Sequence, residues 1–486
     1  MTYDYDVLII GSGPGGYATA LRTSELGLST AVIEKTDVVG GTCLNRGCIP
    51  TKAYLTAAHT LHDVHRAGSW GLDISVNSID MPALKTAKDE TVAGVVKGLT
   101  QHMKARSIDI IHGEGSLSGA HNVSVTDGES TRELSAHHIV LATGSYATPL
   151  PGFDFFHETS AAVSEAIADK KVPVLSSDEA LDLDIPLNNI VVVGAGAIAL
   201  ELAQFWNALG THVTVLLRKD TPLSRWDSHV SSTLMRTLKR DGVRFESHST
   251  LTGAGDGEVT YSIADPKKDT VTEKTIPADF VLAAIGRSPR TTASWFKQAG
   301  IALTSTNRVI TDEYGRTNLE NVWAVGDITD GYMLAHEAFE QALVVSESIA
   351  GLPTQPVDPL TIPQVVYGMI DAVSVGYTSS QAQNAGFEQV EETVVPQLSN
   401  PRVAMLGSNG TTVIVSALNS EKTERVVLGV HMAGPQASEI AGAAREIIQN
   451  RIPLSQAARA LFAHPTISES LGESLLKADG RPLNVR

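Results

Sequence analysis

Two copies of one local pattern constrain the fold of this chain more than any other feature of its sequence. The pattern is a strand, a glycine-rich turn, a helix and a second strand, and its first copy covers residues 5–34. Gly11, Gly13 and Gly16 fit the spacing G-x-G-x-x-G, which lets the backbone turn tightly and approach a pyrophosphate at the helix N-terminus. Glu34 ends the second strand, where a carboxylate can accept hydrogen bonds from a ribose diol. This copy therefore predicts a site for the ADP half of a dinucleotide.

The second copy begins at residue 190 and predicts a second dinucleotide site. Gly194 and Gly196 occupy the first two glycine positions, and Ala199 stands at the third. Alanine is small enough to keep the helix close to the strand. We therefore expect an α/β protein with two Rossmann-like dinucleotide-binding domains.

The end of the second strand differs between the two copies. Where the first copy has an acid, the second has Leu217 followed by Arg218 and Lys219, with Arg225 a turn later. Cations at this position favour the 2′-phosphate of NADP over a free ribose hydroxyl. Solvated surface cations are the alternative, because arginine and lysine are common on protein surfaces.

Two later segments, 137–152 and 321–342, each pair a short apolar strand with a glycine turn. We interpret both as returns to the first nucleotide domain. In the second segment Asp327 follows Gly326 directly after a strand, which suits a carboxylate that binds hydroxyls of a flavin dinucleotide. A Gly-Asp pair that only forms a turn is the alternative.

The chain beyond about residue 353 is predicted to be a separate α+β domain, because a proline-rich stretch there marks a boundary. Alternating apolar residues predict strands at 411–418 and 424–434. Helical periodicity follows at 438–450 and 454–462.

Composition excludes several classes of partner. A length of 486 residues indicates two to four domains. Acidic residues outnumber basic residues by 54 to 37, the formal net charge is −17, and no basic run occurs, which argues against nucleic acid and anionic membranes. No apolar stretch approaches the ~20 residues that cross a bilayer, and the first strand begins within a few residues of Met1. We expect a cytoplasmic protein with no targeting segment, no membrane partner and no metal site.

Cys43 and Cys48 are the only two cysteines of the chain, and they share one window of six residues. A secreted protein of this size held by disulfides would usually have more pairs, so the two thiols indicate a redox site. A helical turn with a distorted start can bring their Cα atoms within the ~4.4–6.8 Å that a disulfide needs. Two unrelated buried thiols are the alternative.

A redox thiol needs a neighbour that lowers its pKa or takes its proton, because a free thiol with a pKa of ~8.5 is mostly protonated at neutral pH. Lys52 is close in sequence, and it could instead lie at a flavin, where a cation stabilises the reduced ring. The best distant candidate for a base is His464, with Glu469 five residues later, since a carboxylate that orients an imidazole is a general-base arrangement. A packed or solvated histidine is the alternative.

Six motifs, in this order, resemble those of the pyridine nucleotide-disulfide oxidoreductases, and among them the lipoamide dehydrogenase group, over essentially the full chain. The motifs are GGTCLNRGCIPTK, LATGSYATPLPG, AIGRSPRT, GDITDGYMLAHEA, GVHMAGPQASEI and AHPTISE. The resemblance implies oxidation of a protein-bound dihydrolipoyl dithiol, with FAD and either NAD or NADP as cofactors. The implied partners are a second copy of the chain, in a homodimer, and a lipoyl-bearing acyltransferase of a 2-oxoacid dehydrogenase complex.

The resemblance also implies a role for each catalytic residue. Cys43 would be the interchange thiol that meets the substrate, and Cys48 would be the thiol beside FAD. His464, positioned by Glu469, would be the base, and it would reach the active site from the other subunit. Lys52 would lie beside the flavin ring.

The same resemblance assigns the cofactor-binding residues and the domains. Lys52 would pair with Glu201. The implied FAD-binding residues are Gly11, Gly13, Gly16, Glu34, Gly41, Thr42, Lys52, Thr143, Gly144, Gly326, Asp327 and Ala335. The implied NAD(P)-binding residues are Gly194, Gly196, Glu201, Arg218, Arg225 and Gly286. The implied domains are an FAD-binding domain of residues 1–150 and 288–352, an NAD(P)-binding domain of residues 151–287 and a C-terminal dimerisation domain of residues 353–486.

Three departures from the family pattern leave alternatives open. Arg218 replaces the acid typical of the NAD-using members, Ala199 replaces a glycine, and Gly368-Met369-Ile370 stands where the family commonly has a residue followed by His-Pro. The first departure favours an NADPH-dependent reductase of another disulfide, similar to glutathione reductase, as the second hypothesis. A flavoprotein kept mainly as a structural subunit of a dehydrogenase complex is the third, and the intact catalytic residues argue against it.

Overall fold

The computed structural model describes residues 3–486, and these form two compact units. Within these residues the first unit consists of 3–53, Lys85–Thr148 and Arg287–Pro359, and the second consists of Tyr54–Leu84, Pro149–Gly286 and Leu360–Arg486. No helix within residues 3–486 is long and apolar enough to span a membrane.

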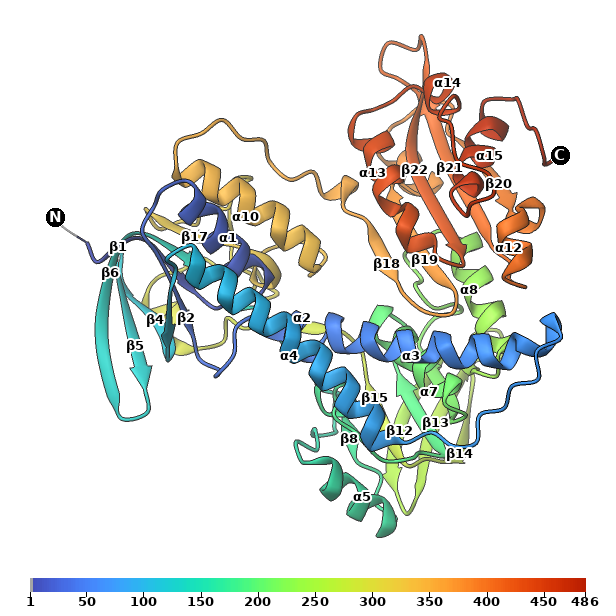
Figure 1. Cartoon of the computed structure of the whole chain (residues 1–486), viewed down its shortest axis with the longest axis horizontal. Coiled ribbons are helices and arrows are strands. Elements are labelled where there is room, and N and C mark those ends of the chain that lie inside the picture. The colour runs from blue at the N-terminus through green and yellow to red at the C-terminus, as the bar shows by residue number, and fades with distance from the viewer. Residues whose placement is uncertain (1–2) are drawn as a thin grey trace. The chain divides into compact units, whose positions relative to one another are not determined.

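The first unit is built on a sheet whose parallel strands run in the order β3-β2-β1-β6, with β17 also paired to β6. These strands are β1 (Tyr5–Ile10), β2 (Thr30–Glu34), β3 (Asp109–His112), β6 (Ser130–Leu141) and β17 (Val322–Ala324). Their apolar runs are buried on both faces, as expected for parallel strands covered by helices. Helices α1 (Pro14–Glu25) and α10 (Ala335–Ile349) pack against each other in this unit (Figure 1). The sheet thus carries the carboxyl ends of β1, β2 and β17 to one edge.

An antiparallel hairpin extends the other end of β6. It consists of β4 (Glu114–Gly119) and β5 (Asn122–Asp127). A separate two-stranded ribbon pairs β7 (Ser145–Ala147) with β16 (Arg287–Pro289). Three helices lie between β2 and β3 in the sequence: α2 (Gly41–Arg46), α3 (Cys48–Arg66) and α4 (Met81–Ala105). A further helix, α9 (Ser294–Gln298), follows where the chain returns to the first unit.

The second unit contains another parallel sheet, in the order β11-β10-β9-β15-β8. Its strands are β8 (Val174–Leu175), β9 (Asn189–Val193), β10 (His212–Leu217), β11 (Arg244–Ser247) and β15 (Phe280–Ala283). Helix α7 (Ala197–Ala208) follows the glycine turn after β9, and α8 (Ser228–Arg240) connects β10 to β11. Strands β12 (Ser249–Gly255), β13 (Glu258–Asp265) and β14 (Thr270–Pro277) add an antiparallel sheet, and α5 (Ser160–Ala168) and α6 (Ser177–Ala180) precede β9.

The C-terminal part of the second unit is an antiparallel sheet in the order β18-β19-β22-β21-β20. Its strands are β18 (Gln364–Val366), β19 (Asp371–Gly376), β20 (Glu391–Pro396), β21 (Thr411–Leu418) and β22 (Arg425–Gly434). Helices α13 (Ala441–Gln449) and α15 (Glu469–Ala478) contact this sheet, as does α8 of the nucleotide-binding part (Figure 1). Shorter helices α11 (Ser379–Asn384), α12 (Pro401–Met405) and α14 (Leu454–Ala457) lie in its connections.

The predicted fold class is confirmed, because two parallel sheets with helices and a C-terminal α+β part are present. One expected helix is shorter than predicted: the periodicity at 454–462 gives only Leu454–Ala457. Leu454 and Ala457 are buried, whereas Arg459, Ala460 and Leu461 are exposed and have no core to face. The domain boundaries proposed from the sequence stay predictions.

Candidate active site

The first glycine turn combines two closed positions with one open position. At Gly11, where φ is +103°, a Cβ atom would lie 2.3 Å from the carbonyl oxygen of Ala142. At Gly16 a Cβ would lie 1.9 Å from the carbonyl oxygen of Gly11. At Gly13, in contrast, the nearest atom is the Cα of Gly41, 4.0 Å away. The backbone at Gly13 therefore faces space at the N-terminus of α1, which fits a pyrophosphate.

The Glu34 carboxylate stabilises the same turn through hydrogen bonds. Its Oε2 accepts hydrogen bonds from the Ser12 backbone N–H at 3.1 Å and the Ser12 hydroxyl at 2.5 Å. Its Oε1 accepts from the Thr36 N–H at 2.9 Å and the Thr36 hydroxyl at 2.8 Å. These four bonds match the ~4 lone-pair sites of a carboxylate. The predicted hydrogen bond from a ribose to Glu34 therefore requires the hydroxyl of Ser12 or of Thr36 to turn away from the carboxylate. The sequence did not predict that Glu34 stabilises this turn.

Asp327 follows β17 after Val325 and Gly326, in the short helical turn Gly326–Ile328. It accepts a hydrogen bond from the Ser145 hydroxyl at the start of β7. Arg287 on β16 donates from Nε to the same hydroxyl at 2.7 Å and from its terminal nitrogen to the Ser145 carbonyl at 3.0 Å. Asp327 is thus oriented by a polar chain that the sequence did not reveal.

Other predicted FAD residues lie in the same unit as this turn. Gly41, with φ of +60°, begins α2, and a Cβ there would lie 2.6 Å from the Gly13 Cα. Thr42 follows it on α2, and Ala335 is the first residue of α10. The Thr143 hydroxyl donates to the Arg290 carbonyl at 3.0 Å, and Gly144 has φ of +73° with open space beside it.

The two cysteines lie on either side of a helix break. Cys43 is on α2, the break is at Gly47, and Cys48 is the first residue of the 19-residue helix α3. A Cβ at Gly47 would lie 3.1 Å from the Thr42 carbonyl oxygen and 3.4 Å from the Cys43 Cα, so the backbone at the break leaves little room for a side chain. Thr51 closes the first turn of α3, because its N–H and hydroxyl both donate to the Gly47 carbonyl, at 3.1 and 2.7 Å. A thiol at a helix N-terminus is favoured as thiolate.

The electrostatics of the pair are unequal. A hydrogen bond with Cys48 and then burial raise the pKa of Cys43, while the charge of Lys52 opposes the rise. The charged form of Cys43 is therefore disfavoured while its hydrogen bond to Cys48 is in place. Tyr17 on α1 is near both thiols: burial, followed by the charges of Cys43 and Cys48, raises the pKa of its phenol to about 12. Sequence reasoning missed Tyr17.

The second glycine turn repeats the arrangement of the first. At Gly194, where φ is +122°, a Cβ would lie 2.2 Å from the Ala284 carbonyl oxygen. At Gly196 no atom lies within 4 Å of a Cβ position, and Gly286, with φ of +137°, is also open. Ala199 is fully buried on α7. The backbone at Gly196 fits a second pyrophosphate.

Three cations lie at and after the carboxyl end of β10. Arg218, Lys219 and Arg225 are exposed, and among residues 3–486 none of them has a hydrogen bond or an ion pair. The acid in this segment, Asp220, is instead 2.7 Å from Nε2 of His248. The side chains of the three cations are therefore available to a phosphate.

Glu201 and a departure from the family pattern meet in the second unit. Glu201 is buried on α7, and its Oε1 accepts from the Tyr367 N–H at 3.2 Å. One turn later the Gln204 amide donates to the Tyr367 carbonyl at 3.3 Å and accepts from the Ile370 N–H at 3.4 Å. A Cβ at Gly368 would lie 2.1 Å from the Gln204 Nε2. Gly368 thus leaves the space that Gln204 fills. The pairing of Glu201 with Lys52 stays a prediction.

His464 and Glu469 form the predicted dyad. His464 Nδ1 is 2.8 Å from Glu469 Oε1, and the Thr466 N–H donates to Glu469 Oε2 at 2.7 Å. Burial tends to raise the pKa of Glu469, but the bonds from Thr466 and His464 outweigh it and lower that pKa below its usual value. An Nδ1–H that donates to this carboxylate leaves Nε2 as the basic nitrogen, and the His464 side chain is 70% exposed.

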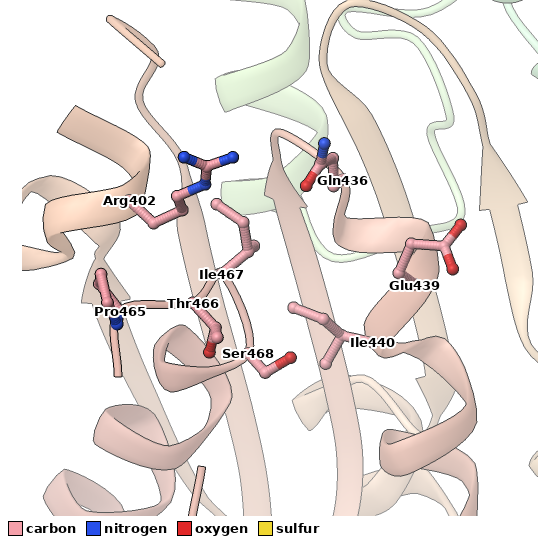
Figure 2. Close-up of a pocket in the computed structure, with 8 residues that line it drawn as sticks. All are labelled: Arg402, Gln436, Glu439, Ile440, Pro465, Thr466, Ile467 and Ser468. Carbon is pink, nitrogen blue, oxygen red and sulfur yellow. The ribbon is translucent and has the colours of Figure 1, made fainter. Parts of the chain in front are cut away.

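A pocket of about 240 Å³ begins directly after His464. Figure 2 shows Arg402 of α12 on one side and the segment Pro465–Ser468 beside it, with Glu439 and Ile440 opposite. No group of three or more histidine, cysteine or acidic side chains within residues 3–486 could hold a metal ion.

Comparisons with known proteins identify the family. Residues 5–342 match the pyridine nucleotide-disulphide oxidoreductase domain, and residues 362–475 match the dimerisation domain of the same family. The mitochondrial dihydrolipoyl dehydrogenase of Schizosaccharomyces pombe is 33% identical over 98% of this chain and 90% of that protein. The dihydrolipoyl dehydrogenase of Chlamydia pneumoniae is 31% identical over 100% of this chain and 99% of that protein.

Solved structures show the same fold. LpdA from Mycobacterium tuberculosis has a TM-score of 0.83 at 24% identity, with 97% of this chain and 99% of that chain covered. The flavoprotein disulfide reductase RclA from Escherichia coli has a TM-score of 0.80 at 23% identity, again over 97% and 99%. The dimerisation-domain match supports a homodimer. With its paired thiols, its two glycine turns and both family domains along its length, the chain belongs to the FAD- and NAD(P)-dependent pyridine nucleotide-disulphide oxidoreductase family.

Proposed function

We propose that this enzyme is a dihydrolipoyl dehydrogenase, which oxidises a protein-bound dihydrolipoyl dithiol and passes the electrons through FAD to a nicotinamide nucleotide. The observation that carries the proposal is the thiol pair across the Gly47 break, in which a hydrogen bond joins Cys43 and Cys48. Relatives named dihydrolipoyl dehydrogenase, 31–33% identical over nearly the full chain, favour this substrate over the disulfide of a glutathione reductase-like enzyme.

The chain's own residues account for the thiol chemistry. Nε2 of His464 accepts the proton of one substrate thiol, and the resulting thiolate attacks Sγ of Cys43 in the oxidised Cys43–Cys48 pair. Cys48 leaves as a thiolate, stabilised at the N-terminus of α3. The second substrate thiol, after losing its proton, attacks the mixed disulfide, which releases the cyclic disulfide product and the Cys43 thiol.

FAD, when bound, would supply the two-electron chemistry that links the cysteine pair to NAD(P)⁺. Gly13, Glu34 and Asp327 would hold it in the first unit. Gly196 and the cations after β10 would hold the nicotinamide nucleotide. A homodimer that docks on a lipoyl-bearing acyltransferase is part of the proposal, and the cytoplasmic location stays an expectation.

Steady-state kinetics with purified holoenzyme test this function. Lipoamide, glutathione disulfide and related disulfides are each measured against NADH and NADPH. Turnover of lipoamide well above that of the other disulfides is expected. Absence of lipoamide turnover with either nucleotide would exclude the proposed substrate.

The unpaired cations after β10 support NADPH as a nucleotide that this chain accepts. Arg218→Glu is expected to raise the KM for NADPH on the order of ten- to a hundredfold, because a charged hydrogen bond is worth ~1.5–3 kcal/mol. The KM for NADH should change little. Arg240→Glu is the control, since Arg240 lies at the end of α8 and pairs with Asp241 at 3.4 Å. Equal effects of Arg218→Glu on both nucleotides would make Arg218 an ordinary surface cation.

A further inference from the structure

We infer that Asn400 is a positioning residue that fixes the geometry of the His464–Glu469 dyad. The inference rests on the proposed function, in which His464 is the base. Asn400 is 66 residues away from Thr466, and its side chain is buried with 7% exposure. Burial and long sequence separation distinguish it from the exposed polar residues near His464.

All hydrogen-bonding groups of the Asn400 side chain are engaged. Its Nδ2 donates to the Thr466 carbonyl at 3.0 Å and to the Ser470 hydroxyl at 2.9 Å. Its Oδ1 accepts from the N–H groups of Arg402 at 2.9 Å and Val403 at 3.3 Å, which caps α12. An amide has two donors and two lone pairs, so Asn400 has no capacity left for other partners.

These bonds hold Thr466 and Ser470, which lie on either side of Glu469 in the sequence. Thr466 is fixed on one side by Asn400 and on the other by its own N–H bond to Glu469 Oε2. Ser470, the residue after Glu469, is fixed by the same amide. The first turn of α15 and the loop that carries His464 are therefore tied together at one buried side chain.

His464 depends on this tie because packing does not hold it. Its side chain is 70% exposed, and within residues 3–486 it is held by a hydrogen bond to Glu469. The Thr466 hydroxyl stabilises the loop by donating a hydrogen bond to the Ala463 carbonyl at 2.8 Å. The direction of the imidazole thus follows from the position of the loop and of Glu469, and a small displacement of a catalytic group costs up to ~100-fold in rate.

The same contact joins the two sides of the pocket next to His464. Arg402, whose N–H donates to Asn400 Oδ1, and the segment Pro465–Ser468 lie beside each other in Figure 2. Asn400 is the residue that bonds to both α12 and this segment. Its loss would let α12 and the His464 loop move independently.

Asn400→Asp tests the role, because the carboxylate still caps α12 but cannot donate to Thr466 and Ser470. We expect kcat with dihydrolipoamide to fall on the order of ten- to a hundredfold, and the pH profile of kcat to shift. The KM for the nicotinamide nucleotide and the FAD content should stay at the wild-type value. Asn409→Asp is the matched control, since Asn409 Oδ1 only accepts a bond, from the Thr237 hydroxyl at 3.3 Å. If Asn400→Asp fails to fold, Asn400→Ser also keeps a cap for α12 but is too short to reach the loop.

A double-mutant cycle distinguishes positioning from a general structural effect. Asn400→Asp in a His464→Gln background should cause no further loss of kcat, because the amide acts through the histidine. Additive losses, or a loss of kcat with an unchanged pH profile, would overturn the inference. If His464→Gln alone keeps wild-type activity, the assignment of the base fails instead, so the two failures are separable.

Discussion

The two thiols have different surroundings although they are five residues apart. Cys48 begins α3, whereas Cys43 lies on α2 and has the raised pKa that results from its bond to Cys48 and from burial. The proposed mechanism, in which Cys48 lies next to the flavin, requires the thiolate at Cys48, at the N-terminus of α3.

Cys48→Ser is expected to abolish the long-wavelength thiolate-flavin absorbance that appears on reduction, because the charged sulfur is lost. Cys43→Ser should retain that absorbance, since Cys48 is intact. Both are measured by anaerobic reductive titration of the holoenzyme. A band that survives in Cys48→Ser would show that the two thiols have been assigned in the wrong order.

His138 gives the first unit a pH-dependent stability. Burial, then the neighbouring charges of His137 and His121, lower the pKa of His138 to about 4 from 6.5. Its Nδ1 accepts a hydrogen bond from the Trp323 indole N–H at 3.3 Å, which requires the neutral ring. The unfolded chain binds the proton more readily, so stability present above pH 6.5 is lost as pH falls toward about 4.

His138→Gln keeps an acceptor for Trp323 and removes this titration. The urea midpoint of the wild type should fall between pH 7 and pH 5 more steeply than that of the variant, as followed by circular dichroism. His212→Gln, on an exposed residue of β10, should behave like the wild type. Identical slopes in His138→Gln and wild type would contradict the role of His138.

Sequence reasoning found residues with local signatures and missed residues whose partners are distant. Cys43, Gly13 and Glu34 are recognisable because their spacing is part of a motif. Asn400 precedes a proline and could have been predicted as a helix cap, but its bonds to residues 66 and 70 positions away leave no sequence pattern. Tyr17 and Ser145 were missed for the same reason.

At the scale of elements, each glycine turn contains one glycine that the backbone conformation requires and another that leaves room for a ligand. Gly194 has φ of +122° and no room for a Cβ, whereas Gly196 has open space. The first turn shows the same contrast between Gly11 and Gly13. One glycine therefore shapes the backbone, and the next leaves room for the nucleotide.

Gly194→Ala should destabilise the protein by at least about 1–3 kcal/mol, since it adds a steric clash to an unfavourable φ. Gly196→Ala should leave the unfolding midpoint near the wild-type value and raise the KM for the nicotinamide nucleotide. Denaturant titration and steady-state kinetics on both variants check this pair. Similar destabilisation by both substitutions would disprove the division of roles.

The elements that alternate cleanly in sequence were the best predicted. The strand expected at 411–418 is β21 (Thr411–Leu418), and the strand expected at 424–434 is β22 (Arg425–Gly434). The hydrogen bonds of the Gln204 side chain with Tyr367 and Ile370 were not predictable. They link a helix to the connection between two strands, 163–166 residues away in the sequence. Two distant positions whose side-chain sizes compensate for each other leave no periodic pattern in the sequence.

At the scale of the whole molecule, the proposed function predicts a site that needs two copies of the chain. The dimerisation-domain match at residues 362–475 includes His464 and Glu469, while both cysteines lie in the match at 5–342. His464 is largely exposed within one chain, as expected for a base that serves a partner. Resemblance, rather than spacing or periodicity, gave this part of the prediction.

Hybrid dimers test whether the base comes from the partner. Cys48→Ser and His464→Gln homodimers are each expected to be nearly inactive. If equal amounts are unfolded, mixed and refolded with FAD, about half of the dimers are hybrids, and each hybrid has one site with intact cysteines and an intact histidine from the other chain. Activity should therefore recover to about a quarter of that of wild type treated in the same way. A mixture that stays inactive while wild type refolds would place His464 and the cysteines of a working site in the same chain.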